Sequence, residues 1–133
     1  MTVEEVYTNA FSASKVAWIE TGTSPYLHDT DADYIRTSTD FANEGDWTFP
    51  NSAGSGTINS VKLRFEADVT QEGCASVAVY VWNGSSWVYA KDLHPTTSYT
   101  WLELDVSSIL NTWTKINDVE VYLEYGRVLS GIC

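Results

Sequence analysis

The sequence predicts an all-β fold in which two antiparallel sheets pack face to face as a jelly-roll-like β-sandwich. At least five segments alternate apolar and polar side chains with a period of two, which a strand separates onto two faces and a helix scatters. Turn signals rich in Gly, Asn, Ser and Pro recur at roughly 8 to 12 residues, and no long helical pattern interrupts them. A closed barrel is the second choice.

Before residue 50 the sequence predicts short strands only. Strand candidates lie around 16–20, 33–37 and 47–49, and polar, Gly and Pro residues separate them. Residues 51–56 read NSAGSG, which predicts a loop from composition alone.

The clearest strand covers 61–69, where every odd position is apolar and every even position is charged. One face of this strand is therefore expected in the core and the other in water. The segments 101–106 and 118–125 alternate in the same way and predict two further strands. Between them, residues 107–113 are expected to form one or two helical turns, capped by a serine, that cross from one sheet to the other.

A hairpin is predicted for the segments 75–82 and 87–90, because the residues between them read NGSS, a tight-turn sequence. With Gly84 and Ser85 as the two turn residues, Trp82 pairs with Trp87 and the strands present their valines on the opposite face.

The charge balance excludes several classes of partner. Lys and Arg total 7 against 18 Asp and Glu, a net charge of -11, so nucleic acid and anionic lipid surfaces are repelled. A neutral glycan, a cationic patch on another protein or a divalent cation fits this charge, and so does solubility alone. No stretch approaches the ~20 apolar residues of a membrane span, so membrane insertion is not expected.

We expect residues 1–133 to form a single domain excised from a longer secreted or surface protein. Cys74 lies in a predicted turn and Cys133 at the end of the sequence. A disulfide between them would be typical of an oxidising compartment, and two unrelated thiols remain the alternative. The expected localisation is extracellular or at the cell surface.

Several strand patterns, in order along about 15–125, are shared with a known group of modules: DADYI at 31–35, a Gly-rich loop, INSVKL at 58–63, VYVWNGSSW at 79–87 and LELDV at 102–106. By these patterns the chain resembles the jelly-roll and galactose-binding-like β-sandwich modules of the carbohydrate-binding-module type. Such modules occur in extracellular, surface and virion proteins. The resemblance implies a module that binds sugars, or one that serves as a spacer or filament unit.

The inventory of catalytic side chains is poor. His28 and His94 lie in polar stretches and belong to no Gly-x-Ser-x-Gly or His-Glu-x-x-His motif. Most carboxylates fall at outward strand positions, where a solvated sheet face explains them. The sequence therefore predicts a protein that is not an enzyme.

Asp29, Asp31 and Asp33 alternate in a predicted loop and form the candidate metal site. Carboxylates at this spacing, joined by backbone carbonyls, can supply oxygens to a structural Ca²⁺. The segment is not a full EF-hand loop, because its sixth position lacks Gly and its twelfth is Asp40. A solvated turn that caps a strand is the alternative.

The candidate ligand-binding site is an aromatic surface on the predicted hairpin. Exposed Trp and Tyr rings stack on the CH-rich faces of sugars while polar groups bind the hydroxyls. Asp105 and Lys91 are further candidate hydroxyl partners. The principal candidate residues are Tyr80, Trp82, Trp87, Tyr89, Asn83 and Glu103.

Two other interpretations of these aromatic residues stay open: stabilisation of the core or sheet, and a protein interface. The function expected first is a non-catalytic carbohydrate-binding module with a polysaccharide or glycan as ligand. The alternative is a structural or adhesive module of a cell-surface or virion assembly, with other surface-protein domains as partners.

If the three aspartates hold calcium, a chelator is expected to lower the melting temperature, because a cation that binds only the folded state stabilises it. Melting curves with and without chelator measure this, and an unchanged midpoint contradicts the calcium hypothesis.

Overall fold

The computed structural model describes residues 10–11, 19–21, 34–36, 43–49, 51–52, 54–69 and 75–127. Asp29, Asp31, Asp33, Cys74 and Cys133 lie outside these residues. The described elements, in chain order, are β1 (Ala10–Phe11), β2 (Ile19–Thr21), β3 (Tyr34–Arg36), β4 (Asn43–Thr48), β5 (Lys62–Ala67), β6 (Ala75–Trp82), β7 (Trp87–Leu93), β8 (Thr100–Asp105), α1 (Trp113–Asn117) and β9 (Glu120–Arg127).

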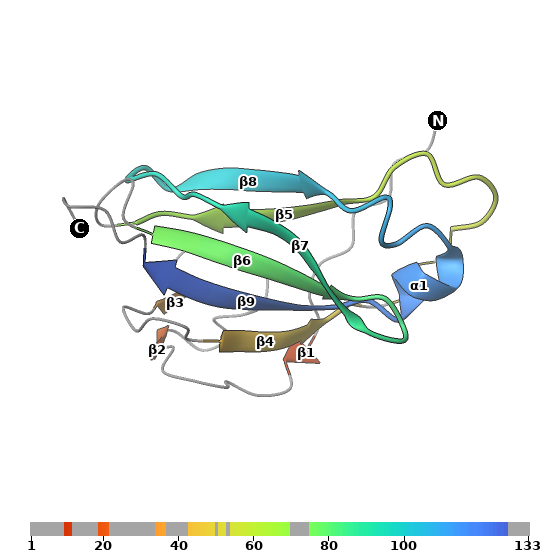
Figure 1. Ribbon diagram of the computed structural model, residues 1–133, viewed down its shortest axis with the longest axis horizontal. Coiled ribbons are helices and arrows are strands. Elements are labelled where there is room, and N and C mark those ends of the chain that lie inside the picture. The colour runs from red at the N-terminus through yellow and green to blue at the C-terminus, as the bar shows by residue number, and fades with distance from the viewer. Residues whose placement is uncertain are drawn as a thin grey trace.

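The predicted two-sheet antiparallel sandwich is confirmed. One sheet has five strands in the order β1-β4-β9-β6-β7, the other pairs β5 with β8, and β2 and β3 form a small separate ribbon. The chain changes sheet between β4 and β5, β5 and β6, β7 and β8, and β8 and β9, as expected of a jelly-roll-like path. Among the described strands, only β6 and β7 are joined as a hairpin within one of these two sheets, and β6 lies between β9 and β7 (Figure 1).

The core lies between the two sheets. The larger sheet contributes Val79, Val81 and Val121, each at most 1% exposed, from its inner face. Leu104 of β8 and residues just after that strand pack against them, as the alternation predicts. The buried hydrophobic cluster as a whole comprises Val79, Val81, Leu93, Leu104, Val106, Leu110 and Val121.

The hairpin has the predicted turn. Gly84 adopts a φ of 96°, which L side chains rarely adopt, and the backbone N–H of Asn83 donates to the carbonyl of Ser86 at 3.2 Å. The register then pairs Trp82 with Trp87, which confirms the expected pairing.

A β-bulge interrupts β7 at Ala90. Tyr80 pairs with Tyr89 but Val79 pairs with Lys91, so one residue of β7 has no partner in the ladder. The extra residue reverses the alternation of the strand beyond it. Leu93 consequently lies on the core side at 6% exposure, although uninterrupted alternation would place it with Tyr89 on the outer face.

A helical turn lies within the predicted segment 107–113, and a short helix follows it. After Val106 the chain makes a turn in which the N–H of Leu110 donates to the Val106 carbonyl, and the five-residue helix α1 follows at Trp113–Asn117. Its N-cap is Thr112, whose hydroxyl accepts from the Lys115 N–H, and not a serine. The segment does connect the two sheets. No helix in the described part of the chain is long and apolar enough to cross a membrane.

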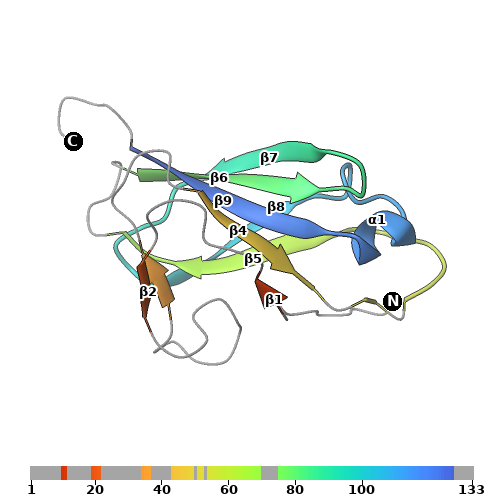
Figure 2. The same cartoon turned by 90° about the horizontal axis from the view of Figure 1, so that it is seen from below.

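The loop at 54–57 packs on α1 at the end of the sandwich where the β6–β7 hairpin turns (Figure 1, Figure 2). The Trp113 indole N–H donates to the Gly56 carbonyl at 3.0 Å, and a Cβ at Gly54 would overlap the Trp113 ring. The backbone N–H of Ser52 donates to the Asn117 side chain at 2.8 Å. The predicted loop thus depends on glycine for this close approach.

We expect Leu110→Ala to lower the free energy of unfolding by about 2–5 kcal/mol, because Leu110 is 1% exposed and its loss leaves a cavity between the sheets. Urea denaturation measures this change. Ser108→Ala, an exposed position in the same turn, is the control and should stay within about 0.5 kcal/mol of the parent. Equal losses in the two variants would contradict the assigned core.

Candidate functional site

The outer surface of the five-stranded sheet carries a cluster of aromatic side chains. Val79 and Val81 of β6 point into the core, so the alternating residues of that strand point away from it. Neighbouring strands add rings on the same side. We call this surface the aromatic face, formed by Tyr80, Trp82, Trp87, Tyr89 and Tyr122.

The strand registers arrange the outward side chains in rows across the sheet. Because β6 pairs with β9 on one side and with β7 on the other, each outward residue of β6 has one neighbour on each side. Read from β9 through β6 to β7, the three rows are Glu124, Ala78 and Asp92; Tyr122, Tyr80 and Tyr89; and Glu120, Trp82 and Trp87.

The rings contact one another across the rows. Tyr80 stacks on Tyr122 with ring centroids 4.5 Å apart and an interplanar angle of 9°. The edge contacts are Tyr80 with Tyr89 at 5.7 Å and Trp87 with Tyr122 at 4.8 Å. Trp82 and Trp87 are tilted at 5.5 Å. Pairs in these geometries stabilise a fold by about 0.5–1.5 kcal/mol beyond their burial.

The aromatic face is not part of the core. Tyr89 is 52% exposed, and the other four rings are half-buried. Tyr122 was not among the candidate residues, although it alternates with core positions of β9. The position of β9 beside β6, which sequence alternation does not specify, brings this ring to the centre of the cluster.

Asn83 lies at the tip of the hairpin, next to Trp82 in the chain. Its side-chain oxygen accepts hydrogen bonds from the backbone N–H groups of Ser85 at 3.0 Å and Ser86 at 2.9 Å. The Ser85 hydroxyl donates to the same oxygen at 3.0 Å. These bonds hold the turn closed, so the Asn83 side chain has a structural role at this end of the face.

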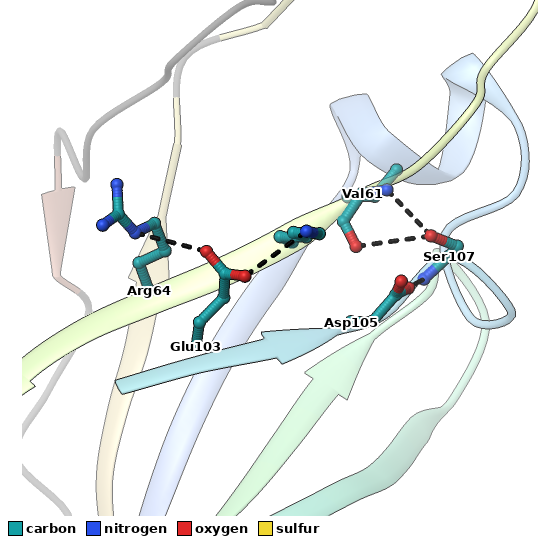
Figure 3. Close-up of polar contacts among 6 residues, drawn as sticks. Val61, Arg64, Glu103, Asp105 and Ser107 are labelled. Atoms are coloured by element: carbon teal, nitrogen blue, oxygen red, sulfur yellow. Dashed lines mark hydrogen bonds and ion pairs between the residues drawn. The ribbon is translucent and has the colours of Figure 1, made fainter. Parts of the chain in front are cut away.

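Glu103 does not join the aromatic residues. It alternates with buried Leu104 on β8 and therefore lies on the outer surface of the two-stranded sheet. There it forms ion pairs with Lys62 at 3.4 Å and with the Nε atom of Arg64 at 3.5 Å (Figure 3). From the sequence, Glu103 is grouped with the rings, but alternation does not specify which sheet contains β8. In the structure β8 belongs to the two-stranded sheet and the rings to the five-stranded sheet.

The two further candidate hydroxyl partners also lie elsewhere. Asp105 accepts a hydrogen bond from the Ser107 N–H at 2.9 Å, at the end of β8 (Figure 3). Hydrogen bonding from Ser107 lowers the pKa of Asp105 below its ordinary value. Lys91 is exposed, but the bulge places it opposite Val79 and out of phase with the rings.

A second, smaller group of exposed aromatic residues accompanies the two-stranded sheet. Trp101 of β8 is 46% exposed and Tyr99, just before that strand, is 44% exposed. The guanidinium of Arg64 lies 5.2 Å from the centre of the Trp101 ring, within cation–π range. The alternation of β8 predicts that Trp101 faces away from the core, because Leu102 and Leu104 face the core. Trp101 is nevertheless not among the candidate residues predicted from the sequence.

Within the described ranges, no three His, Cys, Asp or Glu side chains gather as a metal site would require. The proposed calcium ligands Asp29, Asp31 and Asp33 and the proposed disulfide between Cys74 and Cys133 concern residues outside those ranges.

Comparison of the chain with protein-family models, with curated proteins and with solved structures found no match. Support for the candidate site therefore comes from its geometry in this structure.

The structure predicts an unusual titration for Tyr89. The Asp92 side chain accepts a hydrogen bond from the Tyr89 hydroxyl, which raises the pKa of Tyr89 above its ordinary 10.0. The protonated phenol is favoured in the folded state, so this contact stabilises the fold below the ordinary pKa. The stabilisation is lost as the pH rises through the raised pKa.

Asp92→Asn is expected to return the pKa of Tyr89 toward 10.0. Spectrophotometric titration of tyrosinate measures it, and Tyr89→Phe identifies the curve that belongs to this residue. The same titration midpoint in the parent and in Asp92→Asn would contradict the contact.

Proposed function

We propose that the protein is a non-catalytic carbohydrate-binding module of an extracellular protein, and that it holds a glycan on its aromatic face. The observation that carries the proposal is the tyrosine row, where Tyr122, Tyr80 and Tyr89 lie side by side on three adjacent strands and Tyr89 is 52% exposed. Aromatic side chains at a solvent-exposed sheet face offer apolar rings next to hydroxyl groups.

The arrangement suits a sugar chain that lies across the strands. Three rings in one row extend over two interstrand spacings, about 10 Å. A pyranose ring can stack on the exposed Tyr89, and the adjoining half-buried rings continue the apolar surface along the row. The inner face of the sheet is closed by the core, so the glycan would bind from the solvent side only.

A second candidate function is a structural or adhesive module of a cell-surface or virion assembly with no sugar ligand. The stacking of Tyr80 on Tyr122, and the edge contact of Trp87 with Tyr122, favour it. Ring surfaces that already contact each other contribute to sheet stability whether or not a ligand binds.

Tyr89→Ala is the sharpest test, because Tyr89 is the most exposed ring of the face. We expect this variant to weaken glycan binding by roughly two- to twelvefold, since an aromatic contact contributes about 0.5–1.5 kcal/mol. A glycan array identifies a bound polysaccharide, and affinity electrophoresis in that polysaccharide measures the change. Trp82→Ala should also weaken binding, but it removes the contact with Trp87 as well.

Tyr99→Ala is the matched control: it removes a tyrosine of similar exposure outside the aromatic face and should leave affinity unchanged. Melting curves establish that both variants fold. Equal retardation of parent and Tyr89→Ala would overturn the site. Absence of binding to any glycan, together with concentration-dependent assembly in sedimentation, would favour the structural module instead.

A further inference from the structure

We infer that the glycan recognised by the aromatic face is a cationic amino-sugar polymer, whose ammonium groups bind between Asp92 and Glu124. The inference rests on the proposed function and specifies its ligand class. It comes from the row of side chains next to the tyrosine row.

In this row a small residue stands between two acids. Ala78 of β6 pairs with Glu124 of β9 on one side and with Asp92 of β7 on the other. The two acidic residues are thus two interstrand spacings apart, about 10 Å between backbones. The short Ala78 side chain leaves the surface between them low, and Tyr80, the next outward residue of β6, borders it.

The register places Asp92 beside the rings, because the bulge at Ala90 makes Asp92 the next outward residue of β7 after Tyr89. In agreement with this, Asp92 raises the pKa of Tyr89. A carboxylate accepts several hydrogen bonds at once, so Asp92 retains capacity for a ligand while it holds Tyr89. Asp92 is exposed and Glu124 half-exposed to solvent, so a ligand can reach both.

The charges on this surface have one sign. The three rows contain the acids Asp92, Glu120 and Glu124 and no Lys or Arg. The nearest cationic residue of β7 is Lys91. Because of the bulge it pairs with Val79 and is out of phase with the outward residues of the three rows. The whole chain adds a net charge of -11, which attracts cationic polymers and repels uronates and sulfated sugars.

The two adjacent rows match the two parts of an amino sugar. The apolar face of a pyranose ring would stack on Tyr89, the exposed ring of the tyrosine row, and its ammonium group would extend over Ala78. There it would donate charge-assisted hydrogen bonds to Asp92 and Glu124. An N-acetylated sugar keeps the stacking surface but loses the charge, so it should bind more weakly.

The test compares three oligosaccharides of equal length by isothermal titration calorimetry: a glucosamine hexamer, an N-acetylglucosamine hexamer and a galacturonate hexamer. A mildly acidic buffer keeps the sugar amines protonated. We expect the glucosamine hexamer to bind tightest and to lose affinity as salt is raised, and the galacturonate hexamer not to bind.

Asp92→Asn and Glu124→Gln are each expected to weaken glucosamine binding by about two- to fivefold, and together by roughly tenfold, because partly exposed ion pairs are worth little individually. Binding of the N-acetylated hexamer should not change in Glu124→Gln, which leaves Asp92 and Tyr89 in place. The matched control is Asp68→Asn, which makes the same change in net charge at an exposed residue after β5.

The outcomes separate the two proposals. Equal affinity for the glucosamine and N-acetylglucosamine hexamers, or acid variants that bind glucosamine as the parent does, would overturn the cationic ligand and leave the carbohydrate-binding module standing. Equal weakening by Asp68→Asn would show a long-range charge effect and also overturn the site between Asp92 and Glu124. No binding to these hexamers or to any polysaccharide on the array would overturn both.

Discussion

The burial of the inner face of β6 is the constraint on which the rest of the structure depends. Val79 and Val81 are fully buried against the opposite sheet, and β6 is hydrogen-bonded to β9 and β7 along its length. A slip of one residue would exchange the valines with Tyr80 and Trp82 and expose the core. The core therefore fixes the register, and the register places every outward side chain of the three strands in its row.

The outer surface of the sheet holds its aromatic rings in two different environments. Tyr80 and Tyr122 stack closely enough to stiffen the sheet, whereas Tyr89 at its margin remains largely in solvent. Rings held by their neighbours lose little conformational freedom when a ligand arrives, which reduces the entropic cost of binding. Stabilising contacts at the centre of the face are thus compatible with recognition at its edge, where Asp92 contacts Tyr89.

Local patterns predicted the parts of this protein that depend on near neighbours in sequence. Alternation located β5 to β9 within a few residues, and the NGSS turn gave the pairing of Trp82 with Trp87. Which strands become neighbours depends on packing between segments that are distant in the sequence. Alternation alone therefore could not predict that Tyr122 joins the rings or that Glu103 lies apart from them. The bulge that turns Leu93 inward has no sequence signal in its own strand.

The bulge also bears on how the molecule behaves among copies of itself. β7 is the last strand on its side of the five-stranded sheet, and a straight edge strand presents its backbone groups as a template for another chain. The unpaired residue at Ala90 increases the local twist and interrupts the regular spacing of those groups, and exposed Lys91 and Asp92 follow it. An irregular, charged border of this kind disfavours the edge-to-edge addition of strands from which fibrils grow, next to a surface rich in Trp and Tyr.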